Sequence, residues 1–372
     1  MPQEDLCMRI FKWLKKFSYL VVLLLTNVVL SFLIEPEGGA SGRTWAGYYQ
    51  EENLDTIFVG SSVSQQTFIP EIFNDNMGVQ AYNLGTPSQA IPQTLRAIEV
   101  VMEEHELQMV VFGMGFSSLK YGPIPEAELT FENARTSKKG GLEGVLDTLA
   151  YIYSEDVRGT ENSINFLFPW LYNYENYAKE TLLKNAMTKI ENIKEYWENG
   201  SRDETDGLRK GYRNDDVSVL NYDDKCVTNT HCIYGKDFVP EMLEEFERML
   251  KFCNENNLDL IIVNTPHPAF DVVSCYEYYE DNQNQLKAYC EKYDVDYYDF
   301  SLAKAEIFEN RAEYFGDFEH LNKQGSEAFC QQLSEFLNRR KAGEDMDKYF
   351  YPVEEFLEIH SEEVNDWKEW NK

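Results

Sequence analysis

Cysteine, glycine and proline are all scarce in this sequence, and each shortage excludes a class of protein. The 372 residues contain 21 glycines and 12 prolines, which excludes collagen-like and low-complexity chains. Seven cysteines are too few for a disulfide scaffold of this length, and the lack of a CxxC doublet disfavours a structural zinc site. With 43% hydrophobic and 14% aromatic residues, the chain has material for a sizeable core. Its length predicts two domains, or one large α/β domain with an insertion.

Positive charge is scarce as well. Lys and Arg number 34 against 65 Asp and Glu, which gives a formal net charge of −31 at pH 7. A field of that sign repels phosphate backbones, so we expect no nucleic-acid partner. Two interpretations of the acidity stay open: it keeps the surface soluble, or it attracts a positively charged partner or substrate group.

One long apolar run without charge occupies residues 17–34. As a helix it is long enough to cross a hydrocarbon layer of about 30 Å. Four basic residues precede the run and two acidic residues follow it: Arg9, Lys12, Lys15, Lys16, Glu35 and Glu37. The positive-inside rule then places the N-terminus in the cytoplasm and the rest outside. We predict a cytoplasmic basic segment (1–16), a single-pass anchor in the cell membrane (17–34) and a linker (35–53); a cleaved signal peptide and a buried core helix are the alternatives.

Short apolar segments alternate with helical patterns beyond the predicted linker. Five segments have the composition of buried strands: residues 54–60, 79–85, 107–115, 258–264 and 295–300. Four segments have helical spacing: residues 88–105, 239–257, 277–293 and about 322–340. This alternation predicts an α/β domain over 54–340, with parallel strands joined by crossover helices. Residues 121–235 break the rhythm and predict a helical insertion, with one long helical pattern at 170–200, and 341–372 form an acidic tail.

Polar residues with catalytic potential follow the predicted strand ends. Ser62 follows the first strand, Gly85 follows the second, and Asp317 and His320 precede the last helix. A serine nucleophile needs a base, a carboxylate that orients the base, and N–H donors for the oxyanion. We expect His320 to be the base, Asp317 its orienter, and the backbone N–H groups of Ser62 and Gly85 the donors. Taken one at a time, these residues are more often helix caps and surface pairs than catalytic groups; their joint order along the chain favours the catalytic interpretation.

At these positions the sequence resembles the SGNH (GDSL-like) hydrolase superfamily. The matching blocks are IFVGSSVS (57–64), NLGTPSQ (83–89) and DFEHLNKQG (317–325). The resemblance implies a three-layer, flavodoxin-like fold, a triad of Ser62, His320 and Asp317, and no cofactor. The sequence departs from the family in having Gly-Ser-Ser in the first block and Gly115 where an oxyanion Asn is expected. Loss of one such donor costs about 100- to 1000-fold in rate.

With its apolar run, the sequence is similar to membrane-anchored relatives, namely DltD-like D-alanine-transfer proteins and AlgX/AlgJ-like polysaccharide O-acetyltransferases. This resemblance implies a serine acyltransferase or esterase outside the membrane that acts on O-acetyl or D-alanyl groups of a cell-surface polysaccharide or teichoic-acid-like polymer. It also implies an MBOAT-type membrane acyltransferase as partner. The alternatives are a non-catalytic accessory or scaffold protein of a polymer-modifying complex, and a plain secreted carboxylesterase.

Several other residues are weaker candidates for a site. Asn264 and His267 follow a strand and so lie on the same edge as the triad, where they are candidates for substrate binding or for the missing donor. The alternative for His267 is a loop histidine held between two prolines. Cys226 and Cys232 are the favoured disulfide pair; His231 beside them is a weak metal signal, so no metal site is predicted.

Overall fold

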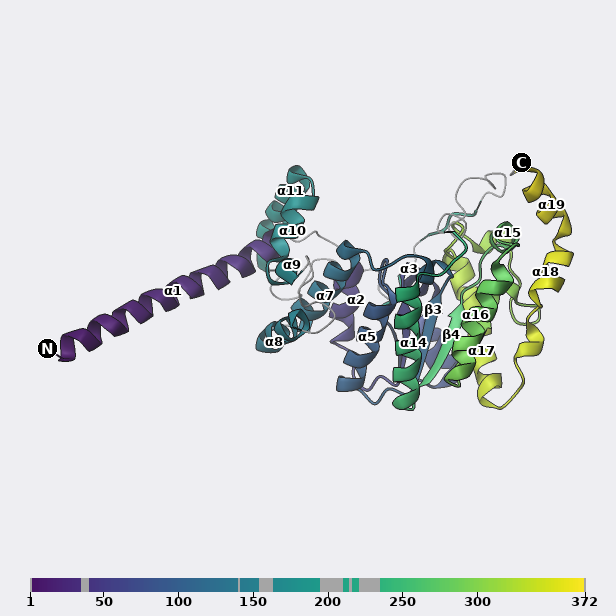
Figure 1. The fold of residues 1–372 in the computed structure, drawn as a ribbon, viewed down its shortest axis with the longest axis horizontal. Helices are drawn as coiled ribbons and strands as arrows, with labels where there is room; N and C mark the ends of the chain where they lie inside the picture. Colours follow the sequence, from purple (N-terminus) through teal and green to yellow (C-terminus); the bar gives the residue numbers. More distant parts are fainter. Residues whose placement is uncertain are drawn as a thin grey trace. The chain divides into compact units, whose positions relative to one another are not determined.

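The computed structural model describes residues 2–34, 40–139, 141–153, 163–194, 210–213, 216–220 and 235–370 (Figure 1). The chain divides into two compact units. The helical unit comprises Met1–Gly39 and Glu132–Glu204, and the sheet unit comprises Ala40–Phe131 and Thr205–Lys372. Each unit is a separate part of the fold and is treated by itself.

The sheet unit is built on five parallel strands in the order β2-β1-β3-β4-β5. Their bounds are β1 Thr56–Gly60, β2 Ala81–Asn83, β3 Met109–Met114, β4 Asp259–Asn264 and β5 Asp296–Asp299. Each strand lies within a segment predicted as a strand, and this strand order is the flavodoxin-like one. The predicted α/β class with a parallel sheet is therefore confirmed.

Helices cover both faces of this sheet. The helices of the sheet unit are α2 Ala40–Tyr48, α3 Ser62–Thr67, α4 Pro70–Met77, α5 Ile91–Glu104, α6 Ser117–Lys120, α14 Pro240–Glu255, α15 Ala269–Ser274, α16 Tyr279–Lys292, α17 Lys323–Lys341, α18 Val353–Ile359 and α19 Ser361–Trp370, with α7 Pro125–Lys139 starting in it. On one face, Phe58, Val111 and Ile261 of the strands join a core with Phe73 of α4 and Phe329 of α17. Side chains alternate along a strand, so Ile57, Val110 and Leu260 point to the other face of the sheet. On that face α5 contacts β1 and α14 contacts β4.

Two predicted boundaries differ from the structure. Residues 40–48 of the predicted linker form α2, whose Trp45 and Tyr48 are fully buried, because these large rings pack in the core of the sheet unit. The predicted insertion is also too wide, since the helical unit takes only Glu132–Glu204 of it. The acidic tail is folded: α18 packs on α16, and α19 packs on α15.

The helical unit contains the apolar N-terminal helix. Its helices are α1 Pro2–Ile34, α8 Gly141–Ile152, α9 Ser163–Leu167, α10 Pro169–Asn176 and α11 Lys179–Glu191, together with the end of α7. The predicted helix over 170–200 is two helices, because the backbone is extended at Tyr177. Within α1, Lys12–Ile34 is long and apolar enough to cross a membrane.

Four cysteines of the sheet unit are buried free thiols: Cys253, Cys275, Cys290 and Cys330. Burial raises the pKa of Cys253 and of Cys290 to about 12, so both are neutral near pH 7. The predicted pair Cys226 and Cys232 lies outside the described residues, as does His231.

Candidate active site

Ser62 stands at the sharp turn between β1 and α3. The turn begins at Gly60, whose φ is +134° and where a Cβ would collide with the carbonyl oxygen of Gly113. Only glycine fits both demands. Ser61 then caps α3, its Oγ accepting a hydrogen bond from Val63 N. Ser62 is therefore the first residue of α3, half-buried, with a backbone N–H that has no acceptor inside its own helix.

The turn before α17 brings His320 to Ser62. His320 Nε2 lies 2.9 Å from Ser62 Oγ, although 258 positions separate them in sequence. His320 Nδ1 lies 2.9 Å from Asp317 Oδ2 and 3.0 Å from Asp317 Oδ1. Asp317 Oδ1 also accepts the backbone N–H of Glu319 and of His320, which fixes the carboxylate within its own turn. The three predicted residues thus form one hydrogen-bonded relay; their catalytic role stays a prediction.

The start of α17 is locked by the residues that follow His320. Asn322 caps the helix, its Oδ1 accepting from Gly325 N at 2.9 Å. A Cβ at Gly325 would collide with Tyr314 O, so this glycine permits the close approach of helix and turn. Ser326 Oγ donates to Gln66 O at 2.7 Å, which ties α17 directly to the helix that carries Ser62.

Burial and neighbouring charges shift the pKa values of both His320 and Asp317. Burial alone lowers the pKa of His320, but the hydrogen bond and charge of Asp317, with the nearby charge of Glu319, raise it above its ordinary value. Burial opposes ionisation of Asp317, whereas the hydrogen bonds from His320 and from two backbone N–H groups hold its pKa below the usual range. An ionised Asp317 accepts from Nδ1–H, which leaves the Nε2 lone pair facing the Ser62 hydroxyl.

A segment assigned to the insertion from sequence contributes to this turn. Leu220 N donates to Phe315 O at 2.8 Å, and Asn322 Nδ2 donates to Ser218 O at 2.8 Å. The charge of Asp216 also raises the pKa of His320. Sequence reasoning missed residues 216–220 because the segment has no strand or helix pattern of its own.

Gly85 does not have the environment expected of an oxyanion donor. Its N–H donates to Asn83 Oδ1 at 2.9 Å, so the predicted donor is already bound. The Asn83 side chain also donates to Ser64 O and Phe68 O, and it therefore fastens the end of β2 to α3. An Asn two residues before a glycine is a turn signal, because its side chain can accept the backbone N–H two positions on. This pattern could have indicated that Asn83 binds the N–H of Gly85.

Asn264 points into the core, an orientation that does not support its predicted role as a substrate contact or oxyanion donor, and that role stays a prediction. It is 1% exposed, and its Nδ2 donates to Asp299 Oδ1 at 2.7 Å and to Tyr279 Oη at 3.4 Å. Tyr279 and Gln283 also donate to Asp299. A buried carboxylate needs several donors, and Asn264 is one of them.

His267 lies beside Gly115, the position where the resemblance predicts an Asn. A Cβ on Gly115 would meet His267 Cε1 and Nε2, each at 3.3 Å. The ring is 1% exposed, and Nδ1 donates to Thr265 O at 2.7 Å, so in neutral His267 the Nε2 atom is an acceptor. The imidazole therefore fills the space of the missing side chain without supplying its donor. Its predicted contact with substrate stays a prediction.

Among the described residues, no group of three or more His, Cys, Asp or Glu side chains could hold a metal ion. No family model matches the chain, and no curated protein matches it.

Two solved structures resemble the chain at a low level. One, from Streptococcus pneumonia and provisionally described as a platelet activating factor, is 10% identical with a TM-score of 0.39 over 86% of this chain and 99% of its own. The other, from Bacteroides fragilis and provisionally described as an acylhydrolase, is 11% identical with a TM-score of 0.34 over 80% of this chain and 95% of its own. At such TM-scores neither likeness carries a functional argument.

Proposed function

We propose that the sheet unit is a serine-dependent esterase or acyltransferase that uses Ser62 as nucleophile. His320 Nε2 takes the proton of Ser62 as Oγ attacks the carbonyl carbon of an acyl ester. The backbone N–H of Ser62 donates to the developing oxyanion. His320 then gives its proton to the leaving alcohol, and the acyl group stays on Ser62 as an ester. An acceptor hydroxyl or water, deprotonated by His320, attacks that ester and restores Ser62.

The observation that carries the proposal is the relay itself. Two hydrogen bonds of 2.9 Å join Ser62 Oγ to His320 Nε2 and His320 Nδ1 to the Asp317 carboxylate. A surface ion pair explains the contact between His320 and Asp317, but it does not explain a hydroxyl from a distant strand end on the other ring nitrogen. Ser62 is also half-buried, so it is reachable from solvent.

A fluorophosphonate probe tests the nucleophile directly. The full-length protein in detergent is expected to form one covalent adduct, and Ser62→Ala is expected to abolish it. Ser64→Ala is the matched control, because Ser64 lies in the same helix and its buried Oγ has no hydrogen-bond partner. Ser64→Ala should label at the wild-type rate. An adduct that survives in Ser62→Ala would overturn the assignment.

We further propose that the domain lies outside the cell membrane, anchored by α1, and passes acyl groups of the O-acetyl or D-alanyl type to or from a cell-surface polymer. An MBOAT-type membrane acyltransferase would be the partner that supplies the acyl group. Support comes from the apolar stretch Lys12–Ile34 and from the resemblance of the three sequence blocks. With Gly85 N–H bound to Asn83 and glycine at position 115, hydrolysis of simple esters is expected to be slow.

The same two departures favour one rival, a non-catalytic accessory protein that retains the fold. The two functions differ in a measurable way. An enzyme turns over an acylated polymer, or p-nitrophenyl acetate slowly, in a manner that requires Ser62. An accessory protein binds the polymer equally well with Ser62→Ala and releases no acyl group.

A further inference from the structure

Nearly the whole uncharged length of α1 is needed to span a bilayer. Residues 17–34 carry no charge and rise about 27 Å as a helix, just short of a hydrocarbon layer of about 30 Å. Residues 12–26, Val28 and Val29 are exposed, whereas Asn27 and residues 30–34 are half-buried within the helical unit. If α1 crosses the membrane, as the proposed function requires, residues 27–34 must also lie in hydrocarbon. The helices packed on those residues then lie at the same depth.

Polar groups at this end of α1 are satisfied by the insertion, as groups in lipid must be. Trp170 Nε1 donates to Asn27 Oδ1, and Asn27 Nδ2 donates to Leu167 O, both at 2.9 Å. Lys189, which is buried, donates to Phe32 O at 2.7 Å. An unpaired amide or carbonyl costs several kcal/mol in a bilayer, roughly as in other apolar media. Contacts with α10 and α11 remove that cost for Asn27 and Phe32.

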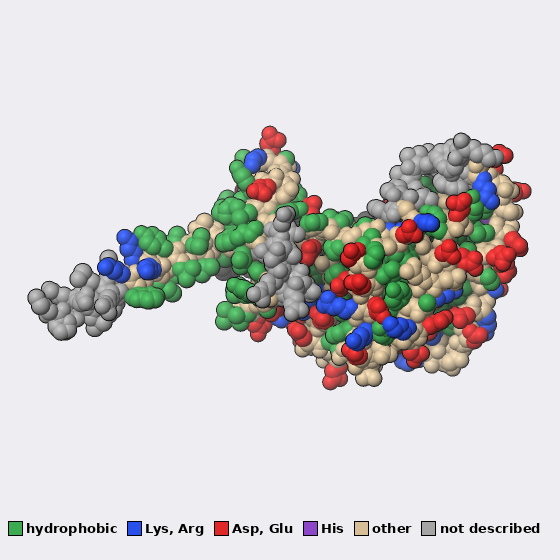
Figure 2. All heavy atoms as spheres, in the orientation of Figure 1, with side chains coloured by type: hydrophobic (Ala, Val, Ile, Leu, Met, Phe, Trp, Pro, Cys, Tyr) green, Lys and Arg blue, Asp and Glu red, His purple; other side chains and the backbone are tan. Residues whose placement is uncertain are grey.

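The outward faces of two insertion helices are apolar. On α8 the exposed fractions of Leu142, Val145, Leu146 and Leu149 range from 38 to 72%. On α11 those of Leu183, Met187 and Ile190 range from 53 to 63%. The spacings of three and four residues place each set on one helical stripe. Figure 2 shows hydrophobic side chains along α1 and over the helices at its C-terminal end.

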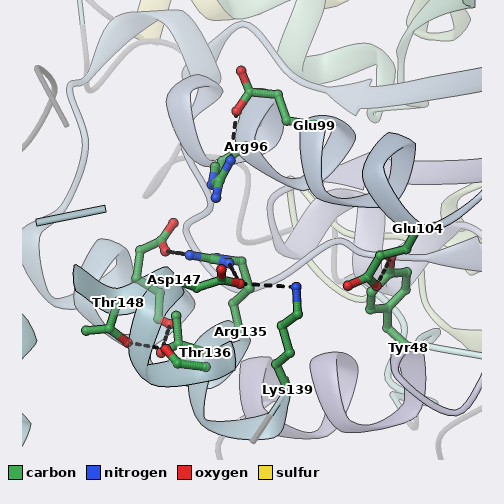
Figure 3. Close-up of polar contacts among 11 residues, drawn as sticks. Tyr48, Arg96, Glu99, Glu104, Arg135, Thr136, Lys139, Asp147 and Thr148 are labelled. Carbon is green, nitrogen blue, oxygen red and sulfur yellow. Dashed lines mark hydrogen bonds and ion pairs between the residues drawn. The ribbon is translucent and has the colours of Figure 1, made fainter. Parts of the chain in front are cut away.

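Charges near α8 are paired with each other. Asp147, one of two acidic residues in this helix, pairs with Arg135 at 3.4 Å and with Lys139 at 3.2 Å (Figure 3). Arg135 is fully buried and also pairs with Glu132 at 2.8 Å. This pairing leaves Glu143 as the one exposed carboxylate among the described side chains of α8. An apolar stripe beside paired charges is typical of a helix that lies in a membrane interface.

We propose that α8–α11 are embedded in the outer leaflet around the end of α1, so that the occupant of the two apolar stripes is lipid. The choice of lipid over a protein partner rests on the contact between α11 and α1, because the apolar stripe of α11 then adjoins a helix that itself faces lipid. Eight residues from Asn27 to Ile34 rise about 12 Å, close to the depth of about 5–10 Å typical of interfacial helices. In this arrangement α8–α11 surround residues 27–34 of α1 within the membrane, and we call them the embedded collar rather than a lid.

Site-directed spin labelling of the full chain in phospholipid vesicles tests this depth. Labels are placed by Leu146→Cys and Met187→Cys, with Val22→Cys in α1 as the lipid reference and Ile359→Cys as the aqueous reference. Ile359 is 56% exposed in the sheet unit, so it matches the test sites in exposure and chemistry. The background replaces Cys7, Cys226 and Cys232 with Ser; the other four thiols are buried. We expect the ratio of oxygen to nickel-chelate accessibility at 146 and 187 to be several-fold above that at 359 and comparable to that at 22.

The outcomes separate this inference from the proposed function. Aqueous values at 146 and 187 with a lipid value at 22 overturn the embedded collar and leave the anchor intact. Aqueous values at positions 22, 146 and 187 overturn both the embedded collar and the anchor. Neither result affects the fluorophosphonate labelling of Ser62, which tests the proposed nucleophile separately. A photo-reactive diazirine side chain at position 183, in the membranes of the cell that makes the protein, identifies the occupant. Lipid adducts support the proposal, and a cross-link to another protein or to a second copy overturns it.

Discussion

The state of a single imidazole governs what this site can do. His320 has a carboxylate on Nδ1 and a hydroxyl on Nε2, and the two partners require opposite roles of the two nitrogens. Because ionised Asp317 only accepts hydrogen bonds, Nδ1 carries the proton and Nε2 is the base. Asp317 thus sets the tautomer of His320. It acts on the reaction only through this hydrogen bond and does not need to contact the substrate.

Replacement of that carboxylate is therefore expected to slow acylation greatly. In Asp317→Asn the side-chain amide can donate to Nδ1, which places the imidazole proton on Nε2 and removes the base. We expect the second-order rate of fluorophosphonate labelling to fall by about 10³- to 10⁴-fold. Binding of polymer should be unchanged. A loss below tenfold would show that Asp317 does not orient His320.

The raised pKa of His320 predicts the pH dependence of the same reaction. The base is active only when neutral, so labelling should rise with pH, with a midpoint above the ordinary histidine value of about 6.5. Glu319→Gln removes one charge that raises this pKa and leaves all three relay residues in place. Its midpoint is expected at lower pH than that of the wild type. A midpoint that stays in place or moves upward contradicts the assignment of His320 as the titrating group.

At the scale of elements, close approaches made possible by glycine hold the relay together. Gly60 lets β1 turn against β3, and Gly325 lets α17 begin against the Tyr314 carbonyl. Ser326 and Cys330 of α17 donate to Gln66 O and Thr67 O at the end of α3. Ser62 in α3 and His320 in the turn before α17 are therefore held by two helices that are hydrogen-bonded to each other, and a shift of either helix changes the distance between Ser62 and His320.

Gly325→Ala is expected to disturb the site through this packing. The new Cβ would collide with a backbone oxygen, so the turn that carries His320 must move, at a cost of more than about 2 kcal/mol in unfolding free energy. Labelling should slow by at least tenfold at temperatures where the variant is folded. Chemical denaturation and probe kinetics measure the two effects.

The matched control for this variant lies at the other end of the same helix. Gly343 has a φ of +83° and open space around its Cα, so Gly343→Ala carries backbone strain of about 1–2 kcal/mol without a collision. It should lose stability and keep the wild-type labelling rate. Equal labelling losses in the two variants would mean that general instability, rather than displacement of His320, is the cause.

At the scale of the whole molecule, excess negative charge opposes folding. The formal net charge is −31, and like charges repel across the compact state. Raising ionic strength from about 0.01 M to about 0.15 M shortens the Debye length from about 30 Å to about 8 Å. We expect the unfolding midpoint of the detergent-solubilised protein to rise by several degrees. A neutral osmolyte at the same osmolality is the control, and a salt-independent midpoint would contradict the prediction.

Patterns fixed by local chemistry were predictable from the sequence. The strands and crossover helices follow from alternation of apolar runs and helical spacing, and all five strands lie where that pattern indicates. The turn from Asp317 to Asn322 is likewise local, because Asp317 accepts its own neighbouring N–H groups and Asn322 caps the helix it begins. Such features depend on residues a few positions apart.

Features that depend on distant partners were not predictable. Asn264 follows a strand, which suggested an outward side chain, but Asp299 thirty-five positions away holds it in the core. Gly85 was assigned as a donor, but the Asn83 side chain takes its N–H while fastening α3. Residues 40–48 have the composition of a linker, but Trp45 and Tyr48 are fully buried. Trp45 packs against Phe131, and Tyr48 packs against Tyr82.

By itself, the sequence determined the order of the elements, the apolar length of α1 and the residue types available for a relay, because periodicity and backbone sterics act over a few residues. Only the tertiary structure decided which way each polar side chain faces. A buried donor or acceptor must find a partner, and that partner comes from whichever distant segment the packing brings near. This is why Ser62 and His320, 258 positions apart, meet at 2.9 Å while Asn264 faces inward.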